Sequence, residues 1–253
     1  MEIVAFKLKK LVPPKDDLLA ALFASKLKLK DGDVLAISSK VVSIAEGRCV
    51  SANKTTKEKL IQQEAELVFA PKKLHKWGYK FTVTNGALVG SAGIDQSNGN
   101  GYFILWPKDP MRSAKQLRAK IMKHYGVNKL GIVITDSTSR PMRRGASGFA
   151  LAWAGFNPLY DYRGSPDIFG RIIQVEQANI ADSLAAAAVL SMGEGSEQTP
   201  VALMRDVPKS VWNAKPVPKG ETPYIVSLKD DLFAPFLQSV KWKKGKKKRP
   251  PPK

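Results

Sequence analysis

The 253-residue sequence has one cysteine, two histidines and no long apolar run, and each shortage narrows the possible functions. Cys49 cannot form a disulfide within the chain, which fits a reducing compartment, so we expect a cytoplasmic protein. His75 and His124 have no second histidine or cysteine at the spacing of zinc ligands. No apolar stretch approaches the roughly 20 residues that span a bilayer, and the first residues lack the apolar region of a secretory signal. We therefore expect no membrane contact.

Several common catalytic signatures are also missing. The chain has no G-x-x-x-x-G-K-[ST] loop for a nucleotide and no G-x-G-x-x-G turn after a strand for a dinucleotide. It has no G-x-S-x-G elbow for a hydrolytic serine. A P-loop, a Rossmann cofactor site and a serine hydrolase are therefore unsupported.

Acidic side chains are few: the chain has 22 Asp and Glu against 41 Lys and Arg, which gives a net charge of +19. Residues 241–253 alone carry seven lysines and one arginine. We expect one domain at residues 1–238, which could consist of two intertwined subdomains. Residues 239–253 would follow it as a disordered basic tail. The remaining positive charge suits phosphorylated or carboxylated substrates, and the tail would permit weak nucleic-acid contact. A basic RNA-binding protein without catalysis is the alternative to an enzyme.

Helical and strand-like patterns alternate irregularly, which predicts an α+β fold of mixed sheets, hairpins and packed helices. The helix at 109–126 has the clearest boundaries, with Asp109 as its N-cap and Gly126 at its end. Asn85-Gly86 between two strand-like runs predicts a hairpin. The other predicted elements are strands at 1–8, 32–50 (broken at 38–40) and 199–207, and helices at 16–25, 55–69 and 177–193.

The glycine-rich stretch "SAGIDQSNGNG", residues 91–101, is the first candidate site. Asp95 and Asn98 follow a strand-like run, and an acid and an amide on flexible backbone suit phosphate or a hard metal ion. The same residue types are also the commonest in turns, so an ordinary turn is the alternative.

The second candidate is "GIVITDSTSRPMRRG", residues 131–145. Residues 131–134 have the continuous β-branched character of a buried strand. Asp136 at its end is a candidate ligand for Mg²⁺ or Mn²⁺, and the Ser137 hydroxyl could add an oxygen. Phosphate or carboxylate groups could meet the arginines that follow, which are Arg140, Arg143 and Arg144. A polar surface loop is the alternative.

The third candidate is "MGEGSEQT", residues 192–199, after the alanine-rich helix. Glu194 lies between two glycines, with Glu197 and Thr199 close by. Gly193 could simply end the helix, so this stretch is the weakest of the three when taken alone.

Together these segments resemble the coenzyme F420-0:L-glutamate ligase family, the F420:γ-glutamyl ligases, over about residues 1–207. The resemblance is densest in "SAGIDQSN", "VITDSTSRPMRRG", "YDYRGSPDIFGR" and "ADSLAAAAVLSMGEG". It implies the fold of that family, a homodimer, and a GTP-dependent ligation of the amine of L-glutamate to the carboxylate of a cofactor precursor. Two divalent ions, Mg²⁺ or Mn²⁺, would assist, with K⁺ as a further candidate.

The resemblance also implies roles for individual residues. Metal ligands would be Asp95, Asp136, Ser137 and Glu194, and the catalytic set would be Asp95, Asp136 and Arg140. The nucleotide would contact Asn98 and three other segments. These are Leu11, Val12, Pro13 and Pro14; Ser39 and Lys40; and Met192, Gly193, Glu194, Gly195, Ser196, Glu197, Gln198 and Thr199.

The sequence departs from the family pattern at positions that the acceptor could contact. Ile44 replaces a common lysine, Asn85 stands where a polar pair is usual, Ser183 replaces a glutamate, and Thr138, Ser139 and Met142 change "DTFGRPWR" to "DSTSRPMR". These changes leave the predicted metal ligands in place. We expect the coenzyme F420-0 precursor as acceptor, with tetrahydrofolate as the alternative.

Overall fold

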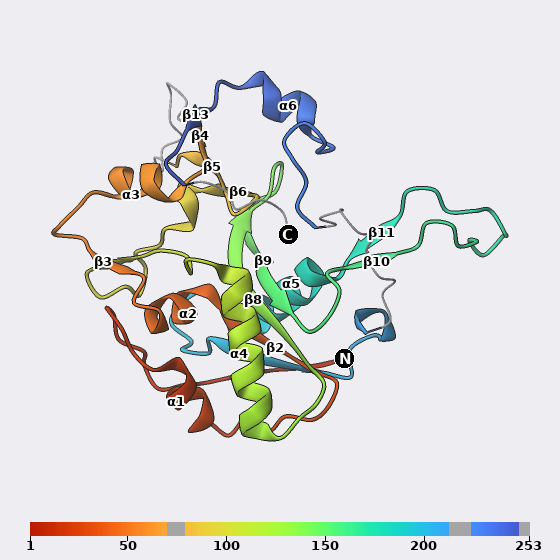
Figure 1. Cartoon of the computed structure of the whole chain (residues 1–253), viewed down its shortest axis with the longest axis horizontal. Helices are drawn as coiled ribbons and strands as arrows, with labels where there is room; N and C mark the ends of the chain where they lie inside the picture. Colours follow the sequence, from red (N-terminus) through yellow and green to blue (C-terminus); the bar gives the residue numbers. More distant parts are fainter. Residues whose placement is uncertain (70–78, 213–223, 248–253) are drawn as a thin grey trace. The chain divides into compact units, whose positions relative to one another are not determined.

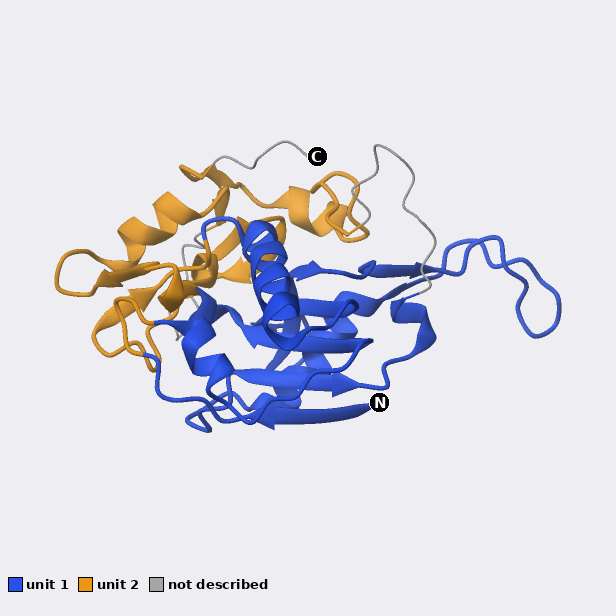
Figure 2. Ribbon diagram, turned by 60° about the horizontal axis from the view of Figure 1, so that its bottom comes forward, with its two compact units in different colours: residues 1–11, 17–42, 108–218 blue, residues 12–16, 43–107, 219–253 orange. Residues whose placement is uncertain are grey.

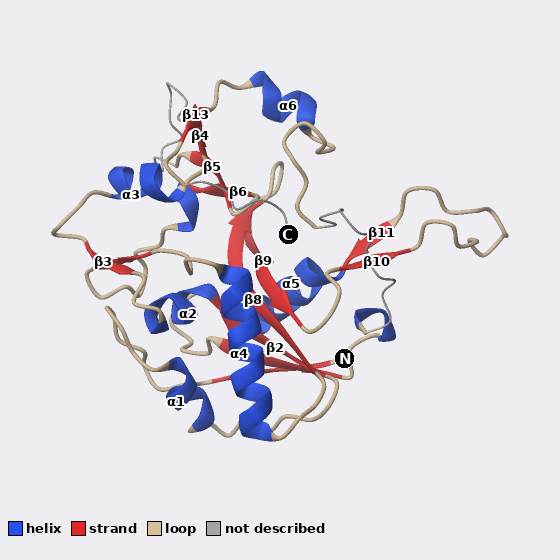
Figure 3. Ribbon diagram, viewed as in Figure 1, coloured by secondary structure: helices blue, strands red, loops and turns tan. Residues whose placement is uncertain are grey.

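The computed structural model describes residues 1–69, 79–212 and 224–247, and the chain passes repeatedly between two compact units. Unit 1 comprises residues 1–11, 17–42 and 108–218, and unit 2 comprises residues 12–16, 43–107 and 219–253 (Figure 2). Each unit combines helices and strands (Figure 3), which confirms the α+β prediction. His75 and residues 248–253 of the basic tail lie outside the described residues.

A five-stranded sheet organises unit 1, in the order β1-β12-β2-β8-β9. Its strands are β1 (Glu2–Phe6), β2 (Asp33–Ser38), β8 (Leu130–Ser139), β9 (Ala146–Ala154) and β12 (Val201–Arg205). β2 and β8 run parallel, and the other neighbours are antiparallel. Both faces of β2 are covered, since Asp33 to Ile37 are all buried, which explains its continuous apolar run.

Helices α4 (Pro110–Tyr125) and α5 (Ile180–Met192) contact β8 and β9, and α1 (Leu18–Phe23) is a shorter helix of the same unit (Figure 1). The ends of α4 are as predicted. The Asp109 carboxylate accepts from the Arg112 N–H at 3.0 Å, and Gly126 adopts a left-handed φ of 67°. Unit 1 also contains the β10 (Leu159–Asp161) and β11 (Gln177–Asn179) ribbon and the short 3₁₀ helix η2 (Lys209–Val211).

A β-bulge joins the sheet to α5. Ile134 pairs with Ala152 but Thr135 pairs with Ala150, so Leu151 is an extra residue in β9. The Ala150 N–H donates instead to Asp182 Oδ1 on α5, at 2.8 Å. A Cβ on Gly148 would lie 2.6 Å from the Ala185 carbonyl oxygen. The alanine run of α5 therefore allows the close packing that its composition indicated.

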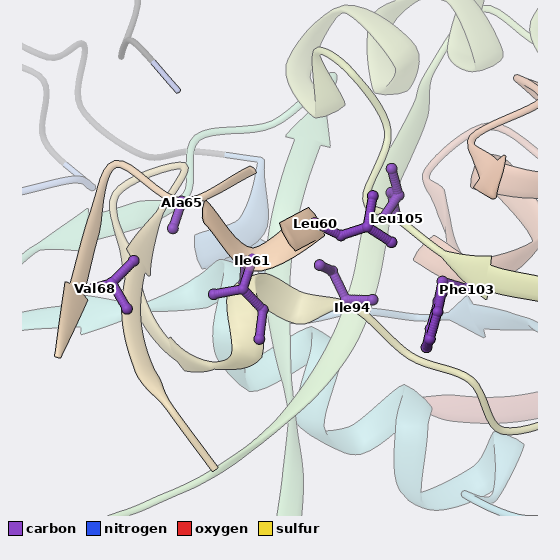
Figure 4. Packing of buried hydrophobic residues seen from close by; sticks show 8 residues of the cluster. Leu60, Ile61, Ala65, Val68, Ile94, Phe103 and Leu105 are labelled. Atoms are coloured by element: carbon purple, nitrogen blue, oxygen red, sulfur yellow. The ribbon is translucent and has the colours of Figure 1, made fainter. Parts of the chain in front are cut away.

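Unit 2 is built around a small apolar core under α3 (Lys57–Glu64). Leu60 and Ile61 of α3 pack with Val68, Ile94 and other buried residues, several of them shown in Figure 4. Its strands are β3 (Cys49–Ser51), β4 (Leu67–Phe69), β5 (Phe81–Thr84), β6 (Ala87–Gly90), β7 (Tyr102–Ile104) and β13 (Lys243–Lys244), with the 3₁₀ turn η1 (Ser91–Gly93) and helix α6 (Ala234–Ser239). β13-β4-β5-β6 form one sheet and β3-β7 another.

The predicted hairpin is confirmed, because β5 and β6 pair across Asn85-Gly86, whose φ angles of 50° and 73° suit a type I′ turn. The prediction that the strand resumes directly after residue 40 is wrong, since a strand returns only at β3, from Cys49. Residues 39–45 form helix α2 (Ser39–Ala45), in which Val41, Val42 and Ile44 are buried. Burial of these β-branched side chains outweighs their weak preference for strands.

The expectation of a disordered tail from residue 239 needs correction for residues 239–247, since Ser239 ends α6 and the residues after it also form defined structure. Lys243 and Lys244 form β13, which pairs with β4. Beyond it, the Lys246 N–H donates to the Gln62 carbonyl at 2.8 Å and the Lys247 N–H to that of Ala65 at 3.2 Å. These bonds satisfy carbonyls at the C-terminal end of α3, where lysine charge also suits the helix dipole.

Gly245 is needed for this close approach, because a Cβ there would lie 1.9 Å from the Ala65 carbonyl oxygen. We expect Gly245→Ala to destabilise the protein by about 1–3 kcal/mol, since backbone must move to relieve the contact. Thermal unfolding of this variant beside Lys244→Ala, an exposed neighbour, would measure the effect. Equal melting temperatures for both variants and the wild type would contradict the seating of this segment.

Candidate functional site

Four of the predicted segments meet at one edge of the unit 1 sheet. β1 ends at Phe6, which pairs with Val201, the first residue of β12. Val201 also pairs with Ile37, and the next parallel pair, Ser38 with Thr135, is the last of that ladder. The segment after β1, the loop before β12, the start of α2 and the residues after Thr135 therefore share this edge, which we call the carboxyl edge. Ligands of α/β sheets commonly bind outside such an edge.

The carboxyl edge holds the predicted residues Leu11, Ser39, Lys40, Asp136 and Ser137, together with residues 192–199. Ser39 and Lys40 are the first residues of α2, directly after β2. The segment after β1 adds Lys9 and Lys10, both exposed. Lysines and a carboxylate at one sheet edge give the mixed charge expected where a metal-bound polyphosphate binds. Within unit 1, these segments therefore lie at the same edge of the sheet.

The sequence suggested that Asp136 lies at the end of a strand. In the structure it does not, because β8 continues to Ser139 and pairs with β9. It is instead the first residue beyond the parallel pairing with β2. Asp136 is half-buried, and its Oδ1 accepts from the Ser137 N–H at 2.8 Å. Successive side chains of a strand point to opposite faces, so one ion on the Asp136 carboxylate would not also take the Ser137 hydroxyl in this conformation.

The strand extension also separates the arginines from the acid. Ser139 lies roughly 10 Å along the strand from Asp136, and Arg140 follows it in the turn to β9. Arg140 is exposed, and its Nε donates to the Ser147 hydroxyl at 3.1 Å. Arg143 and Arg144 are exposed in the same turn. The arginines therefore lie at a distance from the Asp136 carboxylate, not at one point with it.

The loop at 193–199 is held at both ends, although its side chains are largely exposed. The Thr199 hydroxyl donates to the Met192 carbonyl at 2.6 Å, and Gln198 Nε2 donates to the Leu8 carbonyl at 2.7 Å. Inside the loop, Glu197 Oε2 accepts from the Gly195 N–H at 2.8 Å. Gly193 ends α5, which is the alternative that the sequence offered for it. A Cβ added at this position would lie only 2.4 Å from Glu197 Cδ, so the close approach of Glu197 also requires glycine.

Glu194 and Ser196 are exposed in this loop. Glu197, which was expected only as a neighbour of the nucleotide, makes the internal bond that shapes the loop. We infer that Glu194 is the carboxylate better placed to reach a ligand, since Glu197 is already used to hold the backbone.

In unit 2, Asp95 stands in a tightly constrained loop. Ser91, Ala92 and Gly93 have consecutive positive φ angles of 53°, 56° and 69°. The Asp95 carboxylate then accepts from the N–H groups of Gln96 at 2.6 Å and Ser97 at 2.8 Å, and from the Ser97 hydroxyl at 2.8 Å. Left-handed backbone at residues other than glycine is costly and concentrates at functional sites.

A supporting set beneath this loop was missed in the sequence. A Cβ on Gly93 would lie 2.1 Å from the ring of Trp106, which is buried. Arg48 donates through Nε to the Trp106 carbonyl at 3.0 Å and through Nη2 to Glu64 at 2.7 Å. The one hint in the sequence was Arg48 within "AEGR". A local motif cannot predict that Arg48 bonds to Trp106, which lies 58 residues away. Arg48 therefore acts as a positioning residue for the loop that carries Asp95.

The other predicted residues of unit 2 are Asn98 and residues 12–14. Asn98 is exposed, with a φ of 53°. Val12 is exposed and Pro13 buried, and the Val12 N–H donates to Asp16 Oδ2 at 3.1 Å. Each unit thus supplies part of the predicted nucleotide set.

The donor chemistry fits hard divalent ions. In the described parts of the chain, no three or more His, Cys, Asp and Glu side chains form a group that could hold an ion. Magnesium typically takes only one or two protein carboxylates and completes its octahedron with water and phosphate oxygens. Asp136 in unit 1, just after the parallel pairing of β8 with β2, and Asp95 in unit 2, just after the turn of positive φ angles, each offer one carboxylate to such an ion.

Comparisons with known proteins identify the family of the chain. Residues 9–206 match the model of the family F420-0:Gamma-glutamyl ligase. A coenzyme F420:L-glutamate ligase of Methanopyrus kandleri is 37% identical over 81% of this chain and 86% of its own. Proteins of that name from Methanococcus maripaludis and Halobacterium salinarum are 32% and 36% identical, over 84% and 75% of this chain and 91% and 81% of their own.

Within the described residues, no helix has the length and apolar character needed to cross a membrane. The matched range includes the carboxyl edge, the Asp95 loop and Arg48. The family predicted from the motifs is confirmed, and its members are named for ligating glutamate. The chain belongs to the F420-0:gamma-glutamyl ligase family.

Proposed function

We propose that the protein is a GTP- and divalent-metal-dependent ligase that joins L-glutamate by an amide bond to the carboxylate tail of coenzyme F420-0. The observation that carries this proposal is the convergence of four separate segments on the carboxyl edge, which bring Asp136, Lys40 and the exposed Lys9 and Lys10 to the same side of the sheet. Family membership supplies the reaction class. The nucleotide, the metal ions and the intermediate are inferred from the chemistry that such a site supports.

The reaction needs an activated carboxylate. A carboxylate oxygen of the acceptor attacks the γ-phosphorus of GTP, GDP leaves, and an acyl phosphate forms. The amine of L-glutamate then attacks the acyl carbon, inorganic phosphate leaves with its bonding electron pair, and the amine loses a proton. No protein nucleophile takes part, which fits a site of carboxylates, lysines and arginines.

The roles of the residues follow from their positions. Asp136, Asp95 and Glu194 would hold Mg²⁺ or Mn²⁺, which would neutralise phosphate charge when bound. Lys40 and the loop at 193–199 would lie along the nucleotide, since they share the carboxyl edge with Asp136. Arg140 would contact the anionic part of the acceptor or its transferred phosphate, because its exposed guanidinium stands beyond the carboxylate.

Tetrahydrofolate stays the alternative acceptor, since its glutamate γ-carboxylate could undergo the same activation. Two of the positions that depart from the family pattern, Ile44 and Met142, are relevant to the choice of acceptor. Ile44 is 3% exposed, so it does not wall a substrate pocket in this conformation, whereas Met142 is 94% exposed. A direct competition decides the acceptor, with GTP, Mn²⁺, labelled L-glutamate and both acceptors in one reaction. Label on tetrahydrofolate alone would overturn F420-0 as acceptor.

The alternative to an enzyme is a basic RNA-binding protein without catalysis. The argument for it is the lysine-rich C-terminus. Because residues 240–247 are part of unit 2, the truncation that tests this idea removes only residues 248–253. We expect this deletion to leave GTP affinity and ligase activity within about two-fold, and to weaken any salt-sensitive RNA binding. Filter binding and nucleotide titration would measure both. Loss of GTP binding in the deletion, or absence of GTP and ATP binding in the full chain with Mg²⁺ or Mn²⁺, would contradict the enzyme.

A further inference from the structure

A small cavity lies on the β1-β12 part of the unit 1 sheet. Its volume is about 170 Å³. The residues that line it are Glu2, Val4 and Phe6 of β1, Leu203 and Arg205 of β12, and Lys26 and Lys28 of the segment after α1. Glu2 pairs with Arg205 and Val4 with Leu203, so these side chains share one face of the sheet. The cavity therefore has an apolar floor with charged groups around it.

The charged end of the cavity and the carboxyl edge lie at opposite ends of the same strands. Glu2 is the first residue of β1 and Arg205 the last of β12. Phe6, at the other end of β1, is roughly 13 Å away along the strand. The floor is open to solvent, because Val4 is 39% exposed although it stands opposite the buried Leu203. The charged end is therefore separate from the segments that the nucleotide would contact.

Hydrogen bonds from three sides hold the Arg205 guanidinium in one orientation. Its Nε donates to Asp33 Oδ1 at 3.0 Å, and its Nη2 donates to Asp33 Oδ2 at 2.7 Å and to the Lys28 carbonyl at 3.0 Å. Asp33 is only 2% exposed, and its Oδ2 also accepts from the Lys30 N–H at 2.8 Å. Within the described residues, these bonds use the Nε hydrogen and both Nη2 hydrogens. Arg205 therefore still has the two hydrogens of Nη1 to donate to a ligand.

The charge and the size of the cavity define the class of ligand. Buried Asp33 offsets the charge of Arg205. Among the other lining groups, Lys26 and Lys28 outnumber Glu2, so the cavity attracts an anion. The apolar floor favours an apolar body, since a polar group lying on it would lose bonds to water. A cavity of about 150 Å³ holds one benzene molecule, so this one suits a single ring or a short branched chain and is too small for a nucleotide.

We propose that this cavity binds a small monocarboxylate, whose carboxylate accepts from Arg205 Nη1 and whose apolar body lies on Val4 and Leu203. The bonds to Asp33 and to the Lys28 carbonyl fix the guanidinium before the ligand arrives, so binding does not have to order this side chain. A few placed polar groups around an apolar surface are the usual composition of a small-molecule site. The lysines add attraction at the mouth of the cavity.

Titration of the full chain with small probes tests this inference, and the ¹³C methyl resonances of Val4 and Leu203 report binding at the cavity. Benzoate and isovalerate carry both a carboxylate and an apolar body, benzamide lacks the charge, and acetate lacks the body. We expect benzoate and isovalerate to shift both sets of resonances to saturation, with dissociation constants on the order of 1 mM. Benzamide and acetate should bind at least about ten-fold more weakly. Unshifted resonances with both larger carboxylates, or equal affinity for benzamide or acetate, would overturn the proposal.

Val4→Trp tests the location of the site without removing a charge, because the indole would fill the space above the floor. We expect it to weaken benzoate binding at least about ten-fold, read from the Leu203 methyl resonances, and to leave the fold intact because Val4 lies on an edge strand. Val175→Trp enlarges another exposed valine of unit 1, outside the cavity, and should bind benzoate as the wild type does. Wild-type affinity in Val4→Trp would contradict this location.

Substitution of the basic side chains tests the carboxylate contact. Arg205→Lys keeps a positive charge beside Asp33 but lacks Nη1, so we expect benzoate affinity to fall at least about ten-fold. Lys28→Ala should weaken binding about three-fold at low salt, whereas Lys30→Ala, at an exposed lysine that does not line the cavity, should not. Circular dichroism ensures that each variant is folded. Wild-type affinity in folded Arg205→Lys would overturn the carboxylate contact.

The inference is independent of the proposed reaction, because the titrations contain no GTP, metal ion or glutamate. A protein that ligates glutamate but does not bind benzoate or isovalerate at this cavity would overturn the inference and leave the reaction in place. A protein that binds them there without ligase activity would do the reverse.

Discussion

Replacing Asp136 with asparagine should reduce glutamate ligation by about a thousand-fold or more while the protein remains folded. A thousand-fold loss corresponds to about 4 kcal/mol of transition-state stabilisation. Asparagine keeps a side-chain oxygen that can accept from the Ser137 N–H, so the backbone at this point is preserved. It removes the negative charge that would hold a divalent ion on the carboxyl edge. Initial rates at saturating GTP and glutamate, over a range of Mn²⁺ concentrations, would measure the loss.

The neighbouring side chains of β8 supply the controls. Ser137→Ala removes the hydroxyl on the opposite face of the strand, and we expect it to reduce the rate by less than about ten-fold. Thr138→Val tests whether any polar change in this strand has the same effect. Activity of Asp136→Asn within ten-fold of the wild type would show that this carboxylate does not hold a required ion.

The second large effect is expected for Asp95→Asn in unit 2. Asp95 both organises its loop and carries charge, and asparagine separates the two roles. Its oxygen can still accept from the N–H groups of Gln96 and Ser97, while its amide can donate to the Ser97 hydroxyl. We therefore expect a native melting temperature, a loss of at least about a hundred-fold in rate, and weakened metal-dependent binding of GTP.

Ser97→Ala is the matched control for the Asp95 loop. It removes the hydroxyl that donates to Asp95 Oδ2 and leaves the carboxylate charge intact. If the carboxylate acts as a ligand, Ser97→Ala should retain most activity. If Ser97→Ala and Asp95→Asn lose activity equally, then loop geometry and not the charge is the important property.

Local signals were sufficient wherever the residues that end an element lie beside it in sequence. Asp109 and Gly126 bound α4 because their capping interactions are with their own helix. Asn85-Gly86 defines a hairpin because both residues tolerate positive φ. The three candidate stretches could likewise be found, because acids and glycines were concentrated at element ends.

Non-local pairing decided the elements that the sequence did not show. The polar residues 136–139 resemble a loop, but β9 supplies partners for their backbone and extends β8 to Ser139. In residues 240–247, lysine content indicates disorder, yet backbone bonds to the end of α3 fix the segment. The separation of Arg140 from Asp136 follows from the first of these pairings. Neither composition nor spacing contains the partner strand, so the site geometry could not be derived.

The strand order also has a consequence for biosynthesis. β1 is synthesised first but lies next to β12, whose residues follow it by roughly 195 positions. At about 5–20 residues per second, a ribosome needs on the order of 10–40 s to make the intervening chain. β2 also pairs with β12, so one of its edges lacks a partner for almost as long. A nascent chain stalled before residue 201 would therefore carry the first strand of its main sheet without a partner, and would be the form most in need of chaperones.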